Sequence, residues 1–365
     1  MAALFCCATV LLRILRPVHY GVEISCTHPK PHARCSSTGK WFWLWPERKH
    51  AGPKPCAPIY AEELFLIAST ITSSVIILAW QDHEMTASCL ASLGTQAQLI
   101  VVDNGSDEDY ARQLVLECTK YGAEYIRAPH NLGFAGGMNL GLNAARGDVV
   151  VFSNNDIVAS PEALTALAGA CFEPGVGAVF PEILDGDGVP STACGRFLTL
   201  GRAIAHALGL TLLANSKHRL ESDVADAEWF SGPFVAMRRQ LAISIGGMPS
   251  QSFMYSEDYR LCAAIRGIGL WPHLLRGTKV RHLDDASALK VWTSHEVAGL
   301  QTRELVVAAA DQQRTRARGT VLAAAFVFGT WWRYRIRPSP LRLSILESAC
   351  EGFSKFRRPA LSQKS

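Results

Sequence analysis

Four short apolar runs, separated by helix-like segments, constrain the fold more than any other feature of this chain. The runs cover residues 74–80, 98–102, 123–127 and 148–152. Their length, β-branched content and polar ends predict buried strands. The helices between them are expected to end near Leu93 and to span residues 107–121 and 136–145. Strands that alternate with helices indicate a mostly parallel sheet with crossover connections.

The composition is that of a globular protein. The 365 residues are 48% hydrophobic and 19% charged, with a mean hydropathy of +0.11. These values exclude an intrinsically disordered chain. The net charge of +4 does not suggest a nucleic-acid binder. The eleven cysteines are odd in number and lack paired spacing, which favours a reducing compartment.

The first 70 residues differ from the rest and show no helical or strand period. Their metal-capable side chains match no zinc-site spacing. These side chains are Cys26, His28, His32 and Cys35. We expect an irregular extension that is either disordered or upstream of the native start. The second alternative needs a non-Met initiation codon, because no methionine separates Met1 from Met85.

Three strand ends carry side chains suited to a sugar nucleotide. Ligands of such sheets bind beyond the carboxyl ends of the strands. Trp80 offers an aromatic face there, Asp103 a carboxylate, and residues 154–156 a cluster of oxygens. Asp103 could equally cap its own turn. Asn155 and Asp156 supply hard ligands that suit Mg²⁺ or Mn²⁺. A helix cap is the alternative, although Ser160 already gives the next helix a cap.

Two further segments are candidates for chemistry. The glycine-rich segment from Asn131 to Gly141 could bring backbone close to a phosphate or ribose, and it matches neither the Rossmann nor the P-loop spacing. The adjacent acids Glu257 and Asp258 could raise each other's pKa into the range of a general base. They could instead be acids favoured at a helix N-terminus. His282 follows an expected strand, and a lone histidine is more often structural.

Together these segments resemble the family-2 glycosyltransferases of the GT-A fold, particularly the bacterial rhamnosyltransferase-like branch. The resemblance covers about residues 74–287. It rests on motifs in the family's order, at residues 102–106, 131–139, 154–156, 231–232, 246–248, 254–258 and 282. One motif departs from the pattern, because Ala79-Trp80-Gln81 stands where the family has Thr-Tyr-Asn.

The resemblance implies an α/β fold of GT-A type. Its sheet would be Rossmann-like, mixed and mostly parallel, flanked by helices, with a C-terminal helical extension. The residue patterns place an irregular N-terminal extension (1–70) before the glycosyltransferase domain (71–300) and a basic, helical, membrane-associating region (301–365) after it.

The resemblance also implies an inverting transfer of a sugar from a nucleotide-diphosphate donor to a hydroxyl of a glycan or lipid-linked acceptor. The sugar would be rhamnose-like or a related hexose, and the setting polysaccharide or cell-envelope biosynthesis. Asp258 would be the general base beside Glu257, and Asp156 with His282 would hold a divalent metal, Mg²⁺ or Mn²⁺. The implied donor-binding residues are Trp80, Asp103, Asn131, Gly136, Gly137, Asn139 and Asn155.

The positive charge is concentrated at the C-terminus. Residues 311–365 hold eleven basic and three acidic residues. Residues 321–332 form an apolar run of twelve, too short for a hydrocarbon layer of about 30 Å. Aromatic residues and arginines follow at 331–337, which favours a helix in a membrane interface. We therefore expect a cytoplasmic protein, peripheral on the inner face of the cytoplasmic membrane. The alternative is a helix packed on the catalytic domain.

Two rival functions remain. A non-catalytic relative that binds sugar nucleotide or membrane as a scaffold would explain the altered motif at Trp80, but retention of Asp156, Asp258 and His282 argues against it. A nucleotidyltransferase would need a glycine-rich, basic phosphate loop after the first strand, and residues 80–84 contain no such loop.

Overall fold

The computed structural model describes residues 71–210, 227–283 and 293–357, together with short strands at 34–35, 41–42 and 218–219. The chain divides into two units, residues 1–63 and 64–365. In the first unit, β1 (Arg34–Cys35) pairs antiparallel with β2 (Trp41–Phe42). The candidate metal side chains of this unit lie outside the described residues. All that follows concerns the second unit.

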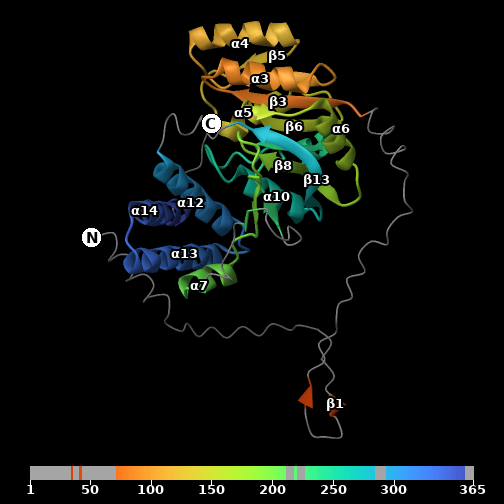
Figure 1. Ribbon diagram of the computed structural model, residues 1–365. Coiled ribbons are helices and arrows are strands. Elements are labelled where there is room, and N and C mark those ends of the chain that lie inside the picture. The colour runs from red at the N-terminus through yellow and green to blue at the C-terminus, as the bar shows by residue number, and fades with distance from the viewer. Residues whose placement is uncertain are drawn as a thin grey trace. The chain divides into compact units, whose positions relative to one another are not determined.

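An eight-stranded mixed sheet forms the centre of the second unit (Figure 1). In spatial order its strands are β5 (Glu124–Arg127), β4 (Gln98–Asp103), β3 (Ser73–Ala79), β6 (Val149–Asn154), β12 (Phe234–Arg238), β8 (Val176–Leu184), β13 (Trp271–His282) and β7 (Ile157–Val158). The first four are parallel to one another. β12 runs antiparallel to both of its neighbours. A small second sheet contains β10 (His218–Arg219), β9 (Ala193–Gly195) and β11 (Trp229–Phe230).

Helices cover both faces of the sheet. They are α3 (His83–Leu93), α4 (Glu108–Tyr121), α5 (Gly133–Leu142), α6 (Pro161–Ala170), α7 (Leu200–Ala207), α9 (Arg239–Ser244), α10 (Glu257–Gly267), α12 (Ser294–Asp311), α13 (Arg316–Ile336) and α14 (Pro340–Arg357). Side chains alternate across β3, so Val75 and Ile77 pack with α3, α4 and α6, whereas Ile76 packs with α5 and α10. The expected α/β class, with a mostly parallel sheet and C-terminal helices, is confirmed.

The expected helix at 136–145 is wrong in its bounds, because α5 covers Gly133–Leu142. The expected start at Gly136 is three residues late, and glycine is by itself a poor helix former. Packing overrides that preference here. A Cβ at Gly137 would overlap Leu78, and one at Gly141 would overlap Ile76. The glycines therefore let α5 lie directly on the sheet.

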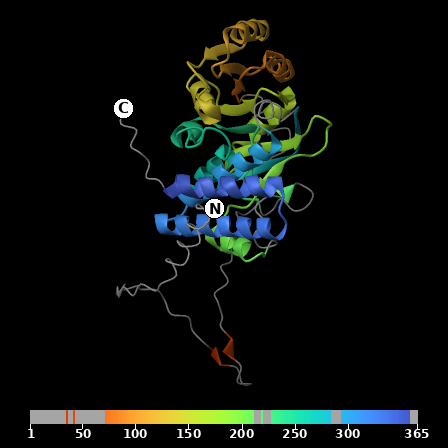
Figure 2. The same ribbon diagram turned by 90° about the vertical axis from the view of Figure 1, so that its left-hand side faces the viewer.

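The C-terminal helices α12, α13 and α14 pack against one another and, through α13, against α7 (Figure 2). His206 of α7 stacks on Phe326 at a centroid distance of 4.7 Å, and its Nε2 lies 2.8 Å from Nη1 of Arg333. Burial and this guanidinium lower the pKa of His206 to about 4, so the neutral ring accepts the hydrogen bond. Among the described helices, none combines the length and hydropathy that a bilayer span requires.

We predict that Gly141→Ala lowers the free energy of unfolding by about 1–3 kcal/mol, because the added methyl group overpacks Ile76 and Val102. Gly201→Ala in α7 is the matched control. A Cβ there meets only Thr199 Oγ1, at 4.0 Å, so this variant should equal or exceed the wild type in stability. Urea denaturation of all three proteins measures both effects. Equal destabilisation by the two variants would contradict the packing argument.

Candidate active site

The carboxylate of Asp103 is fully buried at the end of β4, with both oxygens engaged. Oδ1 accepts a hydrogen bond from the Ser106 amide (2.9 Å), and Oδ2 accepts one from the Tyr125 hydroxyl (2.7 Å). Burial and this carboxylate raise the pKa of Tyr125, so its hydroxyl stays a donor. Asp103 therefore caps its turn, as the alternative interpretation expected. Its contact with a nucleobase stays a prediction.

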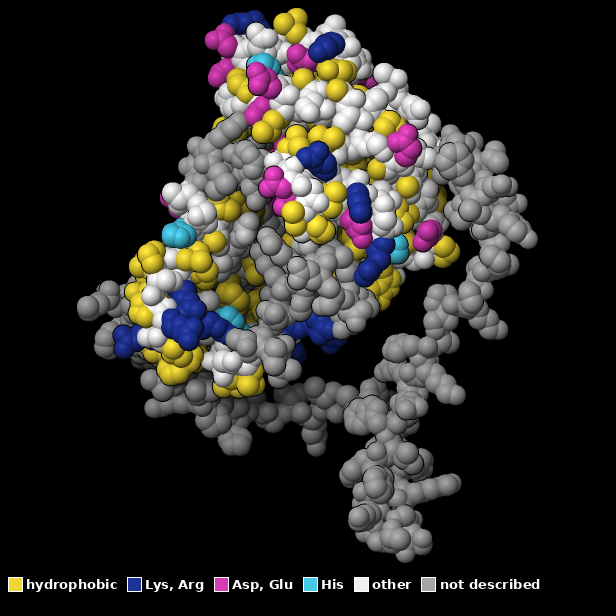
Figure 3. Space-filling view, viewed as in Figure 1, with side chains coloured by type: hydrophobic (Ala, Val, Ile, Leu, Met, Phe, Trp, Pro, Cys, Tyr) yellow, Lys and Arg dark blue, Asp and Glu magenta, His cyan; other side chains and the backbone are white. Residues whose placement is uncertain are grey.

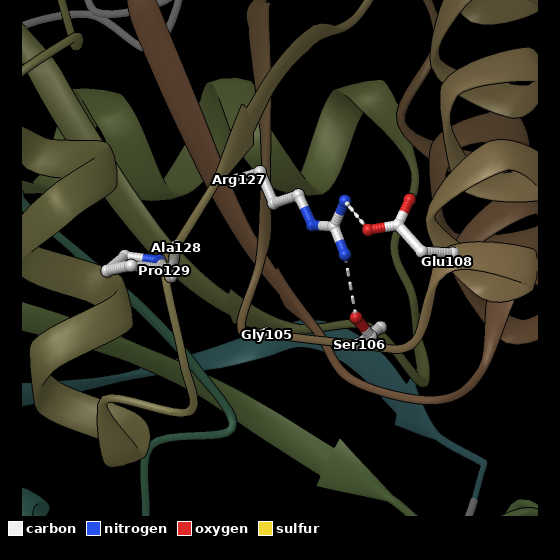
Figure 4. Close-up of a pocket in the computed structure, with 6 residues that line it drawn as sticks. All are labelled: Gly105, Ser106, Glu108, Arg127, Ala128 and Pro129. Carbon is white, nitrogen blue, oxygen red and sulfur yellow. Dashed lines mark hydrogen bonds and ion pairs between the residues drawn. The ribbon is translucent and has the colours of Figure 1, made fainter.

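A cavity of about 430 Å³ opens beside this turn, at the ends of β4 and β5 (Figure 4). The Arg127 guanidinium spans it, bonded to Glu108 (2.8 Å) and to the carbonyl oxygen of Ser106 (3.1 Å). Arg127 Nε also lies 3.7 Å from Asp103 Oδ2. Arg127 is not among the predicted site residues, although its place at the end of an expected strand was a usable signal.

The end of β3 is joined to the same turn. Trp80 is half-buried directly after β3, and the next residue, Gln81, takes a left-handed φ of 54°. The Gln81 amide donates to Ser106 Oγ at 3.1 Å. The altered motif at Trp80 is thus part of the region around the cavity.

Asp156 and His282, which are 126 positions apart, lie next to each other in the structure. β13 pairs antiparallel with β7, which places His282 opposite Ile157. His282 Nε2 is 3.1 Å from Asp156 Oδ1, and the side-chain nitrogen Nδ2 of Asn154 is 3.5 Å from the same imidazole nitrogen. The sheet register therefore assembles the predicted pair.

The donor set around His282 fits a divalent cation. Asp156 is 4% exposed, and the buried Oδ1 of Asn154 accepts no hydrogen bond within the described residues. The buried Oδ1 of Asp156 faces His282 Nε2 at 3.1 Å without hydrogen-bonding geometry. Carboxylate and amide oxygens are the ligands that Mg²⁺ and Mn²⁺ prefer. In the described part of the chain, no group of three His, Cys, Asp or Glu side chains is placed to hold a metal ion. A bound ion would therefore take its other ligands from the sugar-nucleotide donor or from water.

Asn155 and Ser160, which lie near Asp156 in sequence, stabilise the starts of two helices. Asn155 is buried and donates to the Asp82 carbonyl (3.3 Å) and the Thr86 hydroxyl (3.1 Å) at the start of α3. Ser160 caps α6 by accepting the Ala163 amide, so Asp156 is not needed as a cap. A donor contact by Asn155 stays a prediction.

The two asparagines of the glycine-rich segment hold loops together. Asn131 Oδ1 accepts hydrogen bonds from Asn104 Nδ2 (3.0 Å) and the Gly133 amide (2.9 Å). Asn139 makes a two-way amide contact with Met248, donating to its carbonyl (2.8 Å) and accepting from its amide (2.7 Å). Asn131 thus anchors α5 to the end of β4, and Asn139 anchors it to the loop that precedes α10.

The glycines of this segment serve close packing. A Cβ at Gly137 would overlap Leu78, and one at Gly136 would lie 2.8 Å from Leu132 Cβ. Gly133 has a φ of 73°, and a Cβ there would overlap the Phe253 carbonyl oxygen. The donor-binding roles expected of Gly136, Gly137, Asn131 and Asn139 stay predictions, and the contacts seen are structural.

Asp258 lies in the first turn of α10, facing the start of β12. Its Oδ2 accepts a hydrogen bond from the Gly232 amide at 3.0 Å. Burial raises the pKa of Asp258 to about 6, although hydrogen bonds from the Gly232 amide and the Ser231 hydroxyl oppose the rise. A carboxyl group with this pKa is ionised at neutral pH and basic enough to take a proton. The preceding residues, Tyr255 and Ser256, both have left-handed φ values.

Glu257 lies deeper than Asp258 and has the stronger pKa shift. It is 4% exposed, and its Oε1 has no hydrogen-bond partner among the described residues. Burial raises the pKa of Glu257 to about 8, and the charges of Asp258 and Glu304 add to the rise. Glu257 is therefore a neutral acid at pH 7, whereas Asp258 carries the negative charge.

One backbone hydrogen bond lies between the Asp156–His282 pair and the Glu257–Asp258 pair. The backbone N–H of Asn154 donates to the Pro233 carbonyl at 2.9 Å, where β12 starts beside the end of β6. Gly232, which holds Asp258, precedes Pro233, and Asp156 follows Asn154 by two residues. The two groups thus flank one hydrogen bond.

We predict that Glu257→Gln flattens the dependence of stability on pH. The folded-state pKa of about 8 lies well above the ordinary glutamate value of 4.5, so the stability that Glu257 contributes is fully present below about pH 4.5 and is lost as the pH rises through 8. The glutamine side chain of the variant does not ionise, so it loses no stability in this way as the pH rises. Calorimetric Tm values between pH 5 and 8.5 should fall more steeply for the wild type, whereas the exposed control Glu173→Gln should run parallel to it. A parallel curve for Glu257→Gln would refute the buried neutral acid.

Comparisons with known proteins agree with this architecture. Residues 74–193 match the profile of glycosyl transferase family 2. The chain is 33% identical over 95 residues to the uncharacterized glycosyltransferase YfnE of Bacillus subtilis, covering 25% of this chain and 24% of that protein. It is 22% identical over 198 residues to the low-salt glycan biosynthesis hexosyltransferase Agl10 of Haloferax volcanii, covering 53% and 61%. The chain thus spans less than two thirds of each of these curated relatives.

A solved structure shares the fold. GalNAc-T7, crystallised with UDP, GalNAc and Mn²⁺, superposes with a TM-score of 0.52 at 14% identity, over 78% of this chain and 56% of that one. The chain therefore carries a segment, residues 74–193, that matches glycosyl transferase family 2, within an α/β fold that GalNAc-T7 also has.

Proposed function

We propose that this protein is an inverting glycosyltransferase. It would move a sugar, rhamnose-like or a related hexose, from a nucleotide-diphosphate donor to a hydroxyl group of a glycan or lipid-linked acceptor. The observation that carries the proposal is the backbone hydrogen bond from Asn154 to Pro233. The candidate metal ligands, Asp156 and His282, lie on one side of it in the chain, and Gly232, which binds the candidate base Asp258, lies on the other.

The donor would bind along the carboxyl ends of β3, β4 and β6. The Arg127 cavity is open to a planar base, with Trp80 at the neighbouring strand end as the stacking face. Asp103 would act here by fixing Tyr125 and holding Arg127 nearby. The curated relatives with transferase names support a sugar donor, and the presence of UDP in the GalNAc-T7 structure supports a nucleotide-linked one.

Asp156 and His282 would hold a divalent metal, as the Mn²⁺ in the GalNAc-T7 structure suggests by analogy. Such a metal neutralises the charge that develops on a leaving diphosphate. Asp258 would accept the proton of the acceptor hydroxyl as that oxygen attacks the anomeric carbon in line with the departing diphosphate. The Gly232 amide orients the Asp258 carboxylate for this step.

The biological setting belongs to the same proposal. Polysaccharide or cell-envelope assembly at the inner face of the cytoplasmic membrane would present a glycan or lipid-linked acceptor. The C-terminal region 311–365, which has eleven basic and three acidic residues in its sequence, supports a site of action at a membrane surface.

Asp258→Asn should reduce transfer at least about a thousandfold and leave donor binding within about twofold, because the amide keeps the shape but takes no proton. In the wild type, the rate should rise as the pH increases through about 6, where Asp258 ionises. Radiolabel transfer and a pH–rate profile measure these effects. Normal turnover by Asp258→Asn would remove Asp258 from the mechanism.

Asp156→Ala should abolish the metal-dependent stabilisation by donor. A ligand bound only to the native state raises Tm, so the wild type should gain several degrees with a UDP or dTDP sugar plus Mn²⁺ or Mg²⁺. The matched control is Asp185→Asn, a carboxylate that serves a turn. If no donor shifts the Tm of the wild type with either metal, the result contradicts the transferase proposal and favours the non-catalytic scaffold.

A further inference from the structure

One side of α13 carries exposed apolar side chains although the helix is packed on its other sides. Val321, Phe328, Trp332 and Ile336 are 37%, 41%, 46% and 59% exposed. Their spacing of seven, four and four residues places them along one side of an α-helix. We call these four residues the α13 face. The buried positions of the helix, including Leu322, Val327 and Thr330, point elsewhere.

The packing partners of α13 show why this face is left uncovered. α7 occupies one side through the stacked pair of His206 and Phe326, and Gly329 admits the α7 backbone. α12 and α14 occupy another side, where Gly319 lies against Ala310 and Phe356. Both contacts are formed within the described residues, and neither covers the α13 face.

The charge next to the α13 face has one sign. Residues 312–346 contain seven arginines and no acidic residue. Arg333 and Arg342 are engaged in holding α7 and backbone carbonyls, whereas Arg335 and Arg337 are exposed at the end of the face. Figure 3 shows Lys and Arg side chains gathered with hydrophobic ones over the region of α13 and α7.

Nearby elements carry further exposed apolar side chains. Ile204 of α7 and Leu208, which follows α7, are 43% and 69% exposed, and α7 packs along α13. Leu341, at the start of α14, is 40% exposed and follows the end of α13 by five residues. A partner therefore has to accept aromatic and aliphatic side chains together with arginines at their border.

We propose that the α13 face is the surface by which the protein docks onto an anionic lipid bilayer, with Phe328 and Trp332 entering the interface and Arg335 and Arg337 contacting acidic headgroups. This combination suits a membrane interface, since apolar side chains enter the acyl boundary while arginines reach anionic headgroups. The inference rests on the proposed function for its purpose, because a lipid-linked acceptor would be presented at the same surface.

The test is co-sedimentation of the full chain with vesicles of phosphatidylcholine alone or with 30% phosphatidylglycerol. The wild type should bind the anionic vesicles and lose binding as salt rises. Phe328→Glu/Trp332→Glu should reduce the bound fraction at least tenfold, and Arg335→Gln/Arg337→Gln should remove the salt dependence. The control Leu116→Glu changes an apolar residue that is 63% exposed on α4, and it should bind as the wild type does.

Each outcome has a defined meaning. Circular dichroism and Tm identify a variant that fails to fold; in that case the vesicle binding of Arg335→Gln/Arg337→Gln is the test. The inference is overturned if the wild type does not bind anionic vesicles. It is also overturned if Phe328→Glu/Trp332→Glu changes the oligomeric state and leaves vesicle binding unchanged. Donor-induced thermal shifts of the same proteins test the transferase proposal separately, so a donor shift without vesicle binding removes only the membrane surface.

Discussion

The close approach of α5 to the sheet is the constraint on which the candidate site depends. Gly137 and Gly141 remove the side chains that would keep this helix away from Leu78 and Ile76. Held there, α5 reaches the end of β4 through Asn131 and the loop before α10 through Asn139. The turn beside the Arg127 cavity and the loop that leads to Asp258 are thereby fixed to one rigid helix. A looser helix would let these two parts of the site move independently.

Much of the architecture was predictable because the relevant signals are local. A buried parallel strand needs a short apolar run and a polar stop, and the strand ends at Trp80, Asp103 and Asn154 were found in this way. The sheet class follows from the alternation of strands and helices. The proximity of Asp156 and His282 followed from the family resemblance, and the structure explains it by the antiparallel register of β13 and β7.

The features that sequence did not predict depend on contacts between distant segments. An asparagine that binds a donor and one that clips Met248 look alike in sequence, and only the fold separates them, as at Asn139. Arg127 gains its meaning from Glu108 and a turn carbonyl. The apolar run in α13 showed that the helix is hydrophobic. Which of its residues stay exposed depends on how α7 and α14 pack against it.

The reversed direction of β12 also affects how the site could change over time. Because β12 starts where β6 ends, residues 231–232 enter the site from a stretch of chain far from the strand ends at 80, 103 and 154. The stretch that would recognise the donor and the stretch that would present the base are held together by the pairing of β6 with β12 and by the contact of Asn139 with Met248. The side chains that would meet the two substrates nevertheless come from separate parts of the sequence. Such a division lets the preferences for two substrates diverge separately among descendants of one ancestral gene.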